Sequence, residues 1–171
     1  FEEQRAAMSD EDFNMFYRGR KASYRSMIYD CFDRHEHTCK RFKIPDNWEH
    51  YMGIDFGGTH LGATFYAEEP ETKKLYCYRE YMQGGMTIAE HVKVLLSGEM
   101  KPPICYGGSQ SEEQWRREFT RNGLSVYTPK LTSVELGINR VYTQHKQNGI
   151  IYFDDLDGII AEKLKYRRKI D

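Results

Sequence analysis

The chain has 171 residues, which is the size of one domain with a short appendage. Its hydrophobic content of 39% and aromatic content of 14% suffice for a packed core and exclude wholesale disorder. With 25 basic and 26 acidic residues the net charge is −1, so a nucleic-acid partner would have to meet a local basic patch. No apolar run reaches the length of a membrane span and the first residues do not resemble a signal peptide, so we expect no membrane partner and no secretion.

The cysteines and the chain ends suggest a piece of an intracellular protein. Four cysteines are scattered along the chain, and Cys77 and Cys105 fall inside apolar, strand-like runs, where buried reduced thiols are expected. The segment from Cys31 to Cys39 also contains imidazoles, but its spacing matches no zinc motif, and we interpret it as a surface loop. Because the sequence starts without Met and stops at a basic end, we expect it to come from a longer protein.

The first third of the chain has one predicted helix and then an irregular stretch. Residues 1 to about 20 are predicted to be helical, with Ser9 as the cap and Phe13, Phe16 and Tyr17 on one apolar face. Residues 21–50 are rich in aromatic side chains but lack periodicity, and we interpret them as a linker that runs into the first strand.

From residue 51 onward the pattern predicts an α/β fold. Three successive strands are followed by alternating helices and strands, an order typical of a mixed β-sheet with helices on both faces. Capping boxes mark the start of helices at Thr87 and Ser111, and glycines mark their ends. The predicted strands are 51–56, 61–67, 74–81, 104–106, 124–128 and 150–153, and the predicted helices begin near 87, 111, 133 and 156.

The first two strands carry the most informative residue. Asp55 is the single carboxylate in an apolar run, and a glycine-rich turn follows it. Burying a lone carboxylate is costly unless it finds a cation or hydrogen-bond donors, so Asp55 is a metal ligand, a phosphate-site residue or a cap for the turn. The structural alternative is a plain hairpin in which Asp55 caps Gly57-Gly58.

Other acids are predicted to join Asp55. The loop Gly107 to Gln110 leads from another strand end to Glu112 and Glu113, and in an open α/β sheet such strand ends form the ligand site. Asp55 and Glu112 could share Mg²⁺ or Mn²⁺ in a two-metal nuclease site. The alternative is that Glu112 and Glu113 only complement a helix dipole. Asp154, Asp155 and Asp157 are candidates for a third acid, or else helix-capping and solvated residues.

Several side chains are candidates for contacts with phosphates. His60 lies in the glycine turn, where it could touch a phosphate or simply fill the turn. We also predict DNA contacts for Arg116, Lys130 and Arg140, although a solvated helical face is the ordinary role of such residues.

Three segments, taken in order, resemble the nuclease domain of tailed-bacteriophage terminase large subunits. They are the entry Pro45 to Trp48 with the strand Gly53 to Gly57, the segment Ser133 to Val141, and the segment Ala161 to Tyr166. The resemblance covers nearly the whole chain. It implies an RNase H-like fold and a divalent-metal endonuclease that cuts concatemeric double-stranded DNA during packaging.

The resemblance also implies a domain organisation and partners. Residues 1–45 would connect an upstream ATPase motor to a nuclease domain at residues 46–171, and the chain itself contains no phosphate loop of the motor type. A small terminase subunit and a portal protein would be partners in the cytoplasm of the infected bacterium.

By the same resemblance, the catalytic acids would be only partly contained in this chain. Asp55 would be the first catalytic aspartate, with Glu112 as the second acid and Glu113 in reserve. Many relatives have an aspartate directly after the strand 104–106, where this chain has Gly107-Gly108. The third acid of the family lies beyond Asp171, so we expect the domain to be truncated at its C-terminus.

Two other functions fit parts of the sequence. Gly53 to Thr59 also resembles the first phosphate loop of actin-like sugar kinases, which bind ATP and need a second lobe. A DNA-binding or docking module of the same fold would bind DNA without cutting it. Other metal nucleases on this fold, such as junction resolvases, would differ in the structure of the DNA that they cut.

Overall fold

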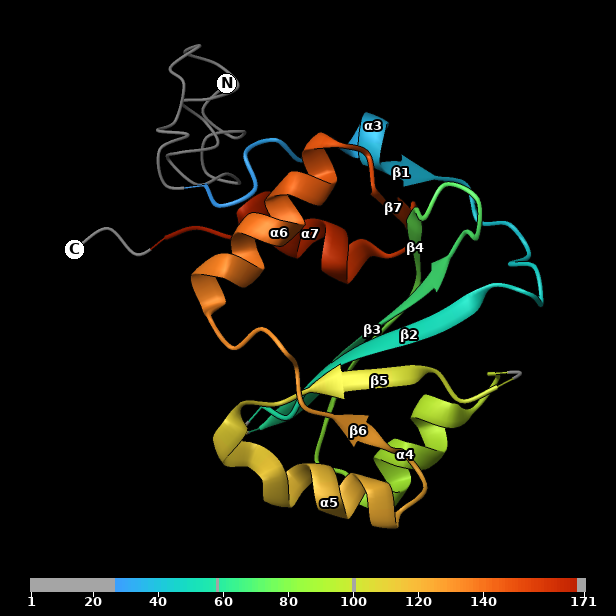
Figure 1. The fold of residues 1–171 in the computed structure, drawn as a ribbon, viewed down its shortest axis with the longest axis vertical. Helices are drawn as coiled ribbons and strands as arrows, with labels where there is room; N and C mark the ends of the chain where they lie inside the picture. Colours follow the sequence, from blue (N-terminus) through green and yellow to red (C-terminus); the bar gives the residue numbers. More distant parts are fainter. Residues whose placement is uncertain (1–26, 58, 100, 169–171) are drawn as a thin grey trace, which may run out of the picture.

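The computed structural model describes residues 27–57, 59–99 and 101–168. The helix predicted over residues 1–20 lies outside these ranges. The described part contains a seven-stranded mixed sheet with the strand order β1-β7-β4-β3-β2-β5-β6 (Figure 1). In chain order the elements are α3 (Arg34–His37), β1 (Thr38–Cys39), β2 (Glu49–Asp55), β3 (His60–Glu68), β4 (Leu75–Gly84), α4 (Ile88–Leu96), β5 (Ile104–Gly107), η2 (Gln110–Glu112), α5 (Glu113–Arg121), β6 (Val126–Tyr127), α6 (Val134–Lys146), β7 (Ile150–Phe153) and α7 (Asp157–Lys165).

The sheet is built on the predicted three-strand meander. β2 pairs antiparallel with β3, and β3 pairs antiparallel with β4. β5 then adds parallel to β2, and β7 adds parallel to β4. As a result β2, β4, β5 and β7 all run in one direction, and their carboxyl ends point to the same edge of the sheet.

Helices cover both faces of this sheet, as the sequence predicts. β3 alternates strictly, with Leu61, Ala63, Phe65 and Ala67 buried on one face. Leu61, Ala63 and Phe65 belong to a core cluster with residues of α4 and α5, including Val92, Leu95 and Phe119. On the other side of the sheet, α6 and α7 pack near β4 and β7 (Figure 1). Within the described residues, no helix combines the length and apolar character needed to cross a membrane.

The segment before β2 is folded into the domain, so the linker predicted over residues 21–50 is wrong for its described part. Tyr29 and Phe32 are 6% exposed and join the core cluster of β7 and α7. The side chain of Asp33 caps α3, and β1 pairs parallel with β7. The error has a physical cause: these aromatic residues show no periodicity because their partners lie far along the chain.

The helix starts follow capping rules, with one shift from the prediction. α4 begins with the predicted capping box of Thr87 and Glu90. The box before α5 is formed by Ser109 and Glu112 and encloses the 3₁₀ turn η2, so the box predicted at Ser111 is wrong. The shift matters for function because it engages the Glu112 side chain with backbone.

A buried histidine makes the stability of the fold depend on pH. His145 is 1% exposed, and its Nε2 lies 3.0 Å from the Tyr152 hydroxyl. Its Nδ1 has no hydrogen-bond partner in the described structure. Burial, together with the charge of Lys163 and the neighbouring His37, lowers the pKa of His145 to about 4. The folded protein therefore keeps this imidazole neutral.

We expect the free energy of unfolding to fall as the pH drops from about 6.5 to about 4, by up to roughly 3 kcal/mol from this residue. The sign follows from proton binding, because below pH 6.5 the unfolded chain protonates this imidazole and the folded chain does not. Urea unfolding across this range measures the effect. In His145→Gln, which keeps a neutral polar group beside Tyr152, the same decrease should be smaller. An unchanged pH profile in that variant would contradict the assignment.

Candidate active site

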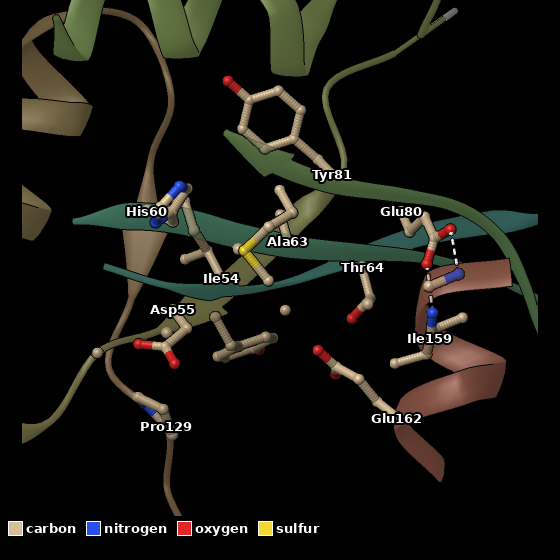
Figure 2. A pocket seen from close by; sticks show the side chains of 17 residues that line it. Ile54, Asp55, His60, Ala63, Thr64, Glu80, Tyr81, Pro129, Ile159 and Glu162 are labelled. Carbon is tan, nitrogen blue, oxygen red and sulfur yellow. Dashed lines mark hydrogen bonds between the residues drawn. The ribbon is translucent and has the colours of Figure 1, made fainter. Parts of the chain in front are cut away.

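A cavity of about 760 Å³ opens on the sheet face at the carboxyl end of β2. Residues of β2, β3, β4, β5 and α7 line it, together with Pro129 from the loop after β6. Among the described residues that line it are three carboxylates, those of Asp55, Glu80 and Glu162, and no Lys or Arg. Figure 2 shows Asp55 and Glu162 on opposite sides of the cavity, with Thr64 on the same side as Glu162. Such a concentration of acids favours binding of a cation.

Strand register explains why the cavity exists. Asp55 pairs with Gly62, and Gly53 pairs with Thr64. These four residues therefore lie on one face of the sheet, whereas Ile54 and Ala63 point to the opposite face and into the core. Glycines at positions 53 and 62 contribute no side chains to the floor of the cavity and so leave space there. A Cβ atom at Gly62 would lie 3.4 Å from the Met82 Cε and would occupy part of this space.

Asp55 has one of the roles that the sequence leaves open, that of a turn cap, and it also lines the cavity. Its Oδ1 accepts a 3.3 Å hydrogen bond from the Gly57 amide, so it does cap the turn of the β2–β3 hairpin. The side chain is also exposed and lines the cavity. Gly57 is required for this turn, because a Cβ atom there would lie 2.1 Å from the His60 carbonyl oxygen.

Glu80 joins β4 to α7 and thereby positions Glu162. Its two carboxylate oxygens accept hydrogen bonds from the first amides of α7, those of Gly158 at 3.0 Å and Ile159 at 2.5 Å (Figure 2). A negative charge at a helix N-terminus is favourable, because the unpaired amides and the helix dipole both attract it. Glu162 lies one turn further along the helix and therefore faces the cavity.

The two glutamates predicted as the second acid lie outside the cavity lining. The Ser109 amide donates a 2.6 Å hydrogen bond to Glu112 Oε2, and the hydrogen bonds with Ser109 hold the pKa of this carboxyl below its usual value. Glu113 accepts from Arg117 on the exposed face of α5. The structure thus gives both residues the helix-terminus geometry that the sequence leaves as the alternative.

The end of β5 and the residue after it have no room for the aspartate that the resemblance leads us to expect there. A Cβ atom at Gly107 would lie 2.0 Å from the Ile54 carbonyl oxygen. At Gly108, where φ is +74°, a Cβ atom would lie 2.6 Å from the Phe56 ring. Close packing against β2 therefore explains the glycines. The other acids of the cavity are Glu80 from β4 and Glu162 from α7. No local sequence pattern marks them, because only tertiary packing brings them to β2.

The predicted phosphate contacts lie in different environments. His60 lines the cavity, and its Nδ1 lies 3.1 Å from the Thr59 hydroxyl. Arg116 is 5% exposed and donates hydrogen bonds to the carbonyls of Gly107 at 3.3 Å and Ser109 at 2.7 Å, so it supports the loop after β5 from inside. Lys130 is exposed next to Pro129 at the cavity rim, whereas Arg140 is exposed on α6 and does not line the cavity.

The acids after β7 are engaged in ion pairs away from the cavity. Asp154 pairs with Lys40 and Asp155 with Arg41, each at 2.6 Å, and Asp157 lies 3.6 Å from Arg34. None of the three aspartates lines the cavity. These acids form ion pairs, and none of them caps α7, whose N-cap residue is Leu156 without a side-chain hydrogen bond.

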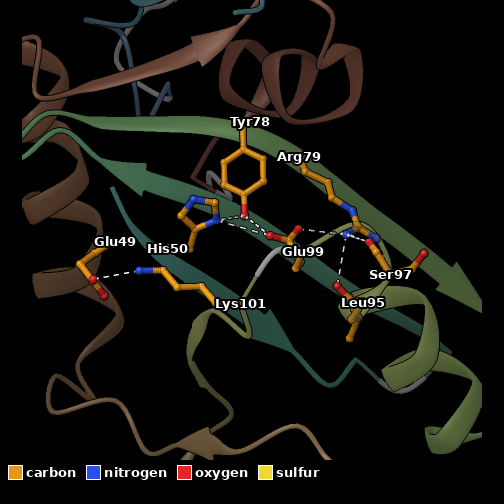
Figure 3. Close-up of polar contacts among 8 residues, drawn as sticks. All are labelled: Glu49, His50, Tyr78, Arg79, Leu95, Ser97, Glu99 and Lys101. Carbon is orange, nitrogen blue, oxygen red and sulfur yellow. Dashed lines mark hydrogen bonds and ion pairs between the residues drawn. The ribbon is translucent and has the colours of Figure 1, made fainter. Parts of the chain in front are cut away.

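A second polar cluster is complete within the protein. The Glu99 side chain is 5% exposed and accepts hydrogen bonds from Tyr78 at 2.7 Å and Arg79 at 3.1 Å, while His50 Nδ1 lies 3.4 Å away (Figure 3). Arg79 also donates to the carbonyls of Val94, Leu95 and Ser97 at the end of α4. A cation at a helix C-terminus stabilises the helix. This cluster therefore ties α4 to β4.

We expect Glu80→Ala to lower the free energy of unfolding by about 1–2 kcal/mol, because the first amides of α7 lose their acceptor. Hydrogen exchange should be faster at Gly158 and Ile159 than in the unmodified protein. Glu71→Ala, in the exposed turn between β3 and β4, is the matched control and should change neither quantity. Unaltered exchange in α7 after Glu80→Ala would show that the cap does not hold the helix.

Comparison with known proteins finds similarity only at the level of structure. No protein-family model and no curated protein matches the sequence. The nuclease domain of the P22 large terminase has a TM-score of 0.71 at 18% identity, with 84% of this chain and 80% of that chain covered. A large terminase from a thermophilic bacteriophage has a TM-score of 0.70 at 18% identity, and the match covers 94% of this chain but 45% of that longer chain.

A third solved structure carries a metal ion. The nuclease domain of the bacteriophage SPP1 large terminase, which has bound Mn, gives a TM-score of 0.58 at 12% identity, with 72% of this chain and 71% of that chain covered. At identities this low the shared property is the fold. The chain has the RNase H-like fold of the nuclease domains of bacteriophage terminase large subunits.

Proposed function

We propose that this chain is the metal-dependent endonuclease domain of a terminase large subunit and that it cuts concatemeric double-stranded DNA during genome packaging. The observation that carries the proposal is the acid-lined cavity at the carboxyl end of β2, which Asp55 and Glu162 line from opposite sides. In open α/β sheets ligands bind at this end of the strands. The shared fold of the terminase nuclease domains supports the same activity.

The cavity suits a hard divalent cation. The described residues contain no group of three His, Cys, Asp or Glu side chains close enough to hold an ion together. Mg²⁺ does not need such a group, since it is commonly bound by one or two carboxylates, waters and substrate phosphates. Asp55 and Glu162 would be the protein ligands. Bound divalent ions would activate water and stabilise the leaving oxygen of the phosphodiester in a two-metal hydrolysis.

The protein's own groups would orient the DNA strand. His60 in the lining and Lys130 at the rim would contact phosphates on either side of the cleaved bond. Glu80 would hold α7, and with it Glu162, against the sheet. Arg116 would keep the loop after β5 in place and would not touch DNA, because its side chain is buried. Arg140 on α6 would contact DNA only outside the cavity.

The full protein would be a packaging motor. The terminase of the thermophilic bacteriophage is about twice as long as the part that this chain matches, which supports an ATPase domain upstream of the nuclease. Double-stranded DNA, a small terminase subunit and a portal protein would then be partners in the cytoplasm of the infected bacterium.

Nicking of supercoiled plasmid in Mn²⁺ tests the proposal. We would assay the 171-residue chain and a longer form that carries the segment beyond Asp171. Asp55→Asn should reduce nicking by about 100-fold or more, because a metal ligand is worth several kcal/mol in the transition state. Glu162→Gln should reduce it similarly, while the exposed control Glu71→Gln should retain full activity.

The same assay compares the two candidates for the second acid. Glu112→Gln should retain most of the activity if Glu112 only caps η2, and should lose as much as Asp55→Asn if Glu112 binds metal. Salt-sensitive DNA binding without cleavage in either length would overturn the nuclease proposal in favour of a docking module. Absence of cleavage together with calorimetric binding of ATP would favour the kinase-like alternative.

A further inference from the structure

Two neighbouring tyrosines are exposed beside the acid-lined cavity. Tyr106 on β5 is 40% exposed and Tyr127 on β6 is 55% exposed. The two residues are paired in the register of β5 and β6, and their ring centroids are 5.8 Å apart. Large aromatic rings are usually covered, so two adjacent exposed rings on a sheet indicate a contact surface.

Strand register places this pair directly at the cavity. Tyr106 pairs with Gly53 of β2, and Gly53 pairs with Thr64 of β3, so one row of the sheet runs from the tyrosines to the cavity floor. Tyr106 itself belongs to the cavity lining. Asp55 lies two residues after Gly53 on the same face of β2. A strand of nucleic acid with a phosphate at Asp55 would therefore pass beside the rings.

The far side of the pair is basic. A groove of about 480 Å³ between α5 and β6 is lined by Tyr127, Thr128, Arg117 and Arg121, among others. Both arginines are well exposed and form ion pairs with Glu113 and Glu118 on the surface of α5. Exposed pairs of this kind contribute little stability, so a phosphate can compete for the guanidinium groups. Exposed arginines, aromatic rings and the cavity carboxylates thus follow one another across the sheet from β6 to β2.

We propose that Tyr106 and Tyr127 form a stacking platform for unpaired nucleotides of the DNA strand that enters the cavity. The proposal rests on the proposed function for the identity of the strand as DNA. Aromatic side chains on open sheet surfaces bind unpaired bases by stacking, whereas a base inside a duplex has both faces covered by its neighbours. The platform therefore predicts a preference for DNA whose bases are unpaired next to the cut phosphate.

Binding of a short, fluorescently labelled single-stranded oligonucleotide tests the platform without cleavage. All proteins would carry Asp55→Asn and would be measured by anisotropy without added metal. Tyr106→Ala and Tyr127→Ala should each weaken binding about tenfold, and the corresponding Phe variants, which keep a ring, should bind nearly as well as the parent. Phe42→Ala, which removes a ring that is also 40% exposed but lies beside Trp48 and Tyr76, is the matched control and should bind normally.

The salt dependence of binding separates the contribution of base stacking from that of contacts between arginines and phosphates. The Tyr→Ala variants should keep the slope of log Kd against log salt, whereas Arg117→Gln and Arg121→Gln should reduce it. Thermal unfolding of each variant would show that it is folded at the assay temperature. Tyr→Ala variants that bind single strands as tightly as the parent, or that weaken duplex binding equally, would overturn the platform.

The two proposals fail in different experiments. Nicking that depends on Asp55, combined with single-strand binding that ignores both tyrosines, would overturn only the platform. Tyrosine-dependent binding in a protein that cuts no DNA would support the platform and would overturn only the nuclease proposal.

Discussion

The alternation of side chains along β2 and β3 is the constraint on which the rest of the structure depends. Neighbouring residues on a strand point to opposite faces, so a strand with one packed face must offer different chemistry on the other. In this protein Ile54, Ala63 and Phe65 face the core under α4 and α5. Gly53, Asp55 and Gly62 face the other way and form the floor of the cavity. A slip of one residue in register would bury the carboxylate and expose the core.

The helices on the cavity face of the sheet determine how much of the cavity floor remains exposed. α6 and α7 cover the part of the sheet near β7 and β4, and the Glu80 cap holds the start of α7 against β4. On the same face of β5 and β6, Tyr106 and Tyr127 lack such cover among the described residues and remain exposed. The cavity lies at the boundary between the covered and the uncovered parts, so it receives acids from the sheet and from α7.

The carboxylates in the cavity and those elsewhere on the protein differ in their partners. Carboxylates that line the cavity have no Lys or Arg beside them in the described lining, while the acids after β7 pair with Arg34, Lys40 and Arg41. Glu99 is buried but satisfied by Arg79 and Tyr78. Buried or clustered acids are stable when cations or donors neutralise them. Among the cavity acids, Glu80 is satisfied by the first amides of α7. Asp55 and Glu162 are exposed and have no Lys or Arg in the described lining, and the proposed divalent ion would bind there.

The sequence by itself determined the order of the elements from β2 onward, the mixed sheet with helices on both faces, and the position of Asp55 at the end of a strand. These features depend on local signals, namely side-chain periodicity, capping residues and glycine turns. Only the tertiary structure decided that Glu80 and Glu162 lie across the cavity from Asp55, that Glu112 caps a turn, and that Tyr29 and Phe32 belong to the core. Residues far apart in sequence meet through sheet register and helix packing, which no short sequence window records.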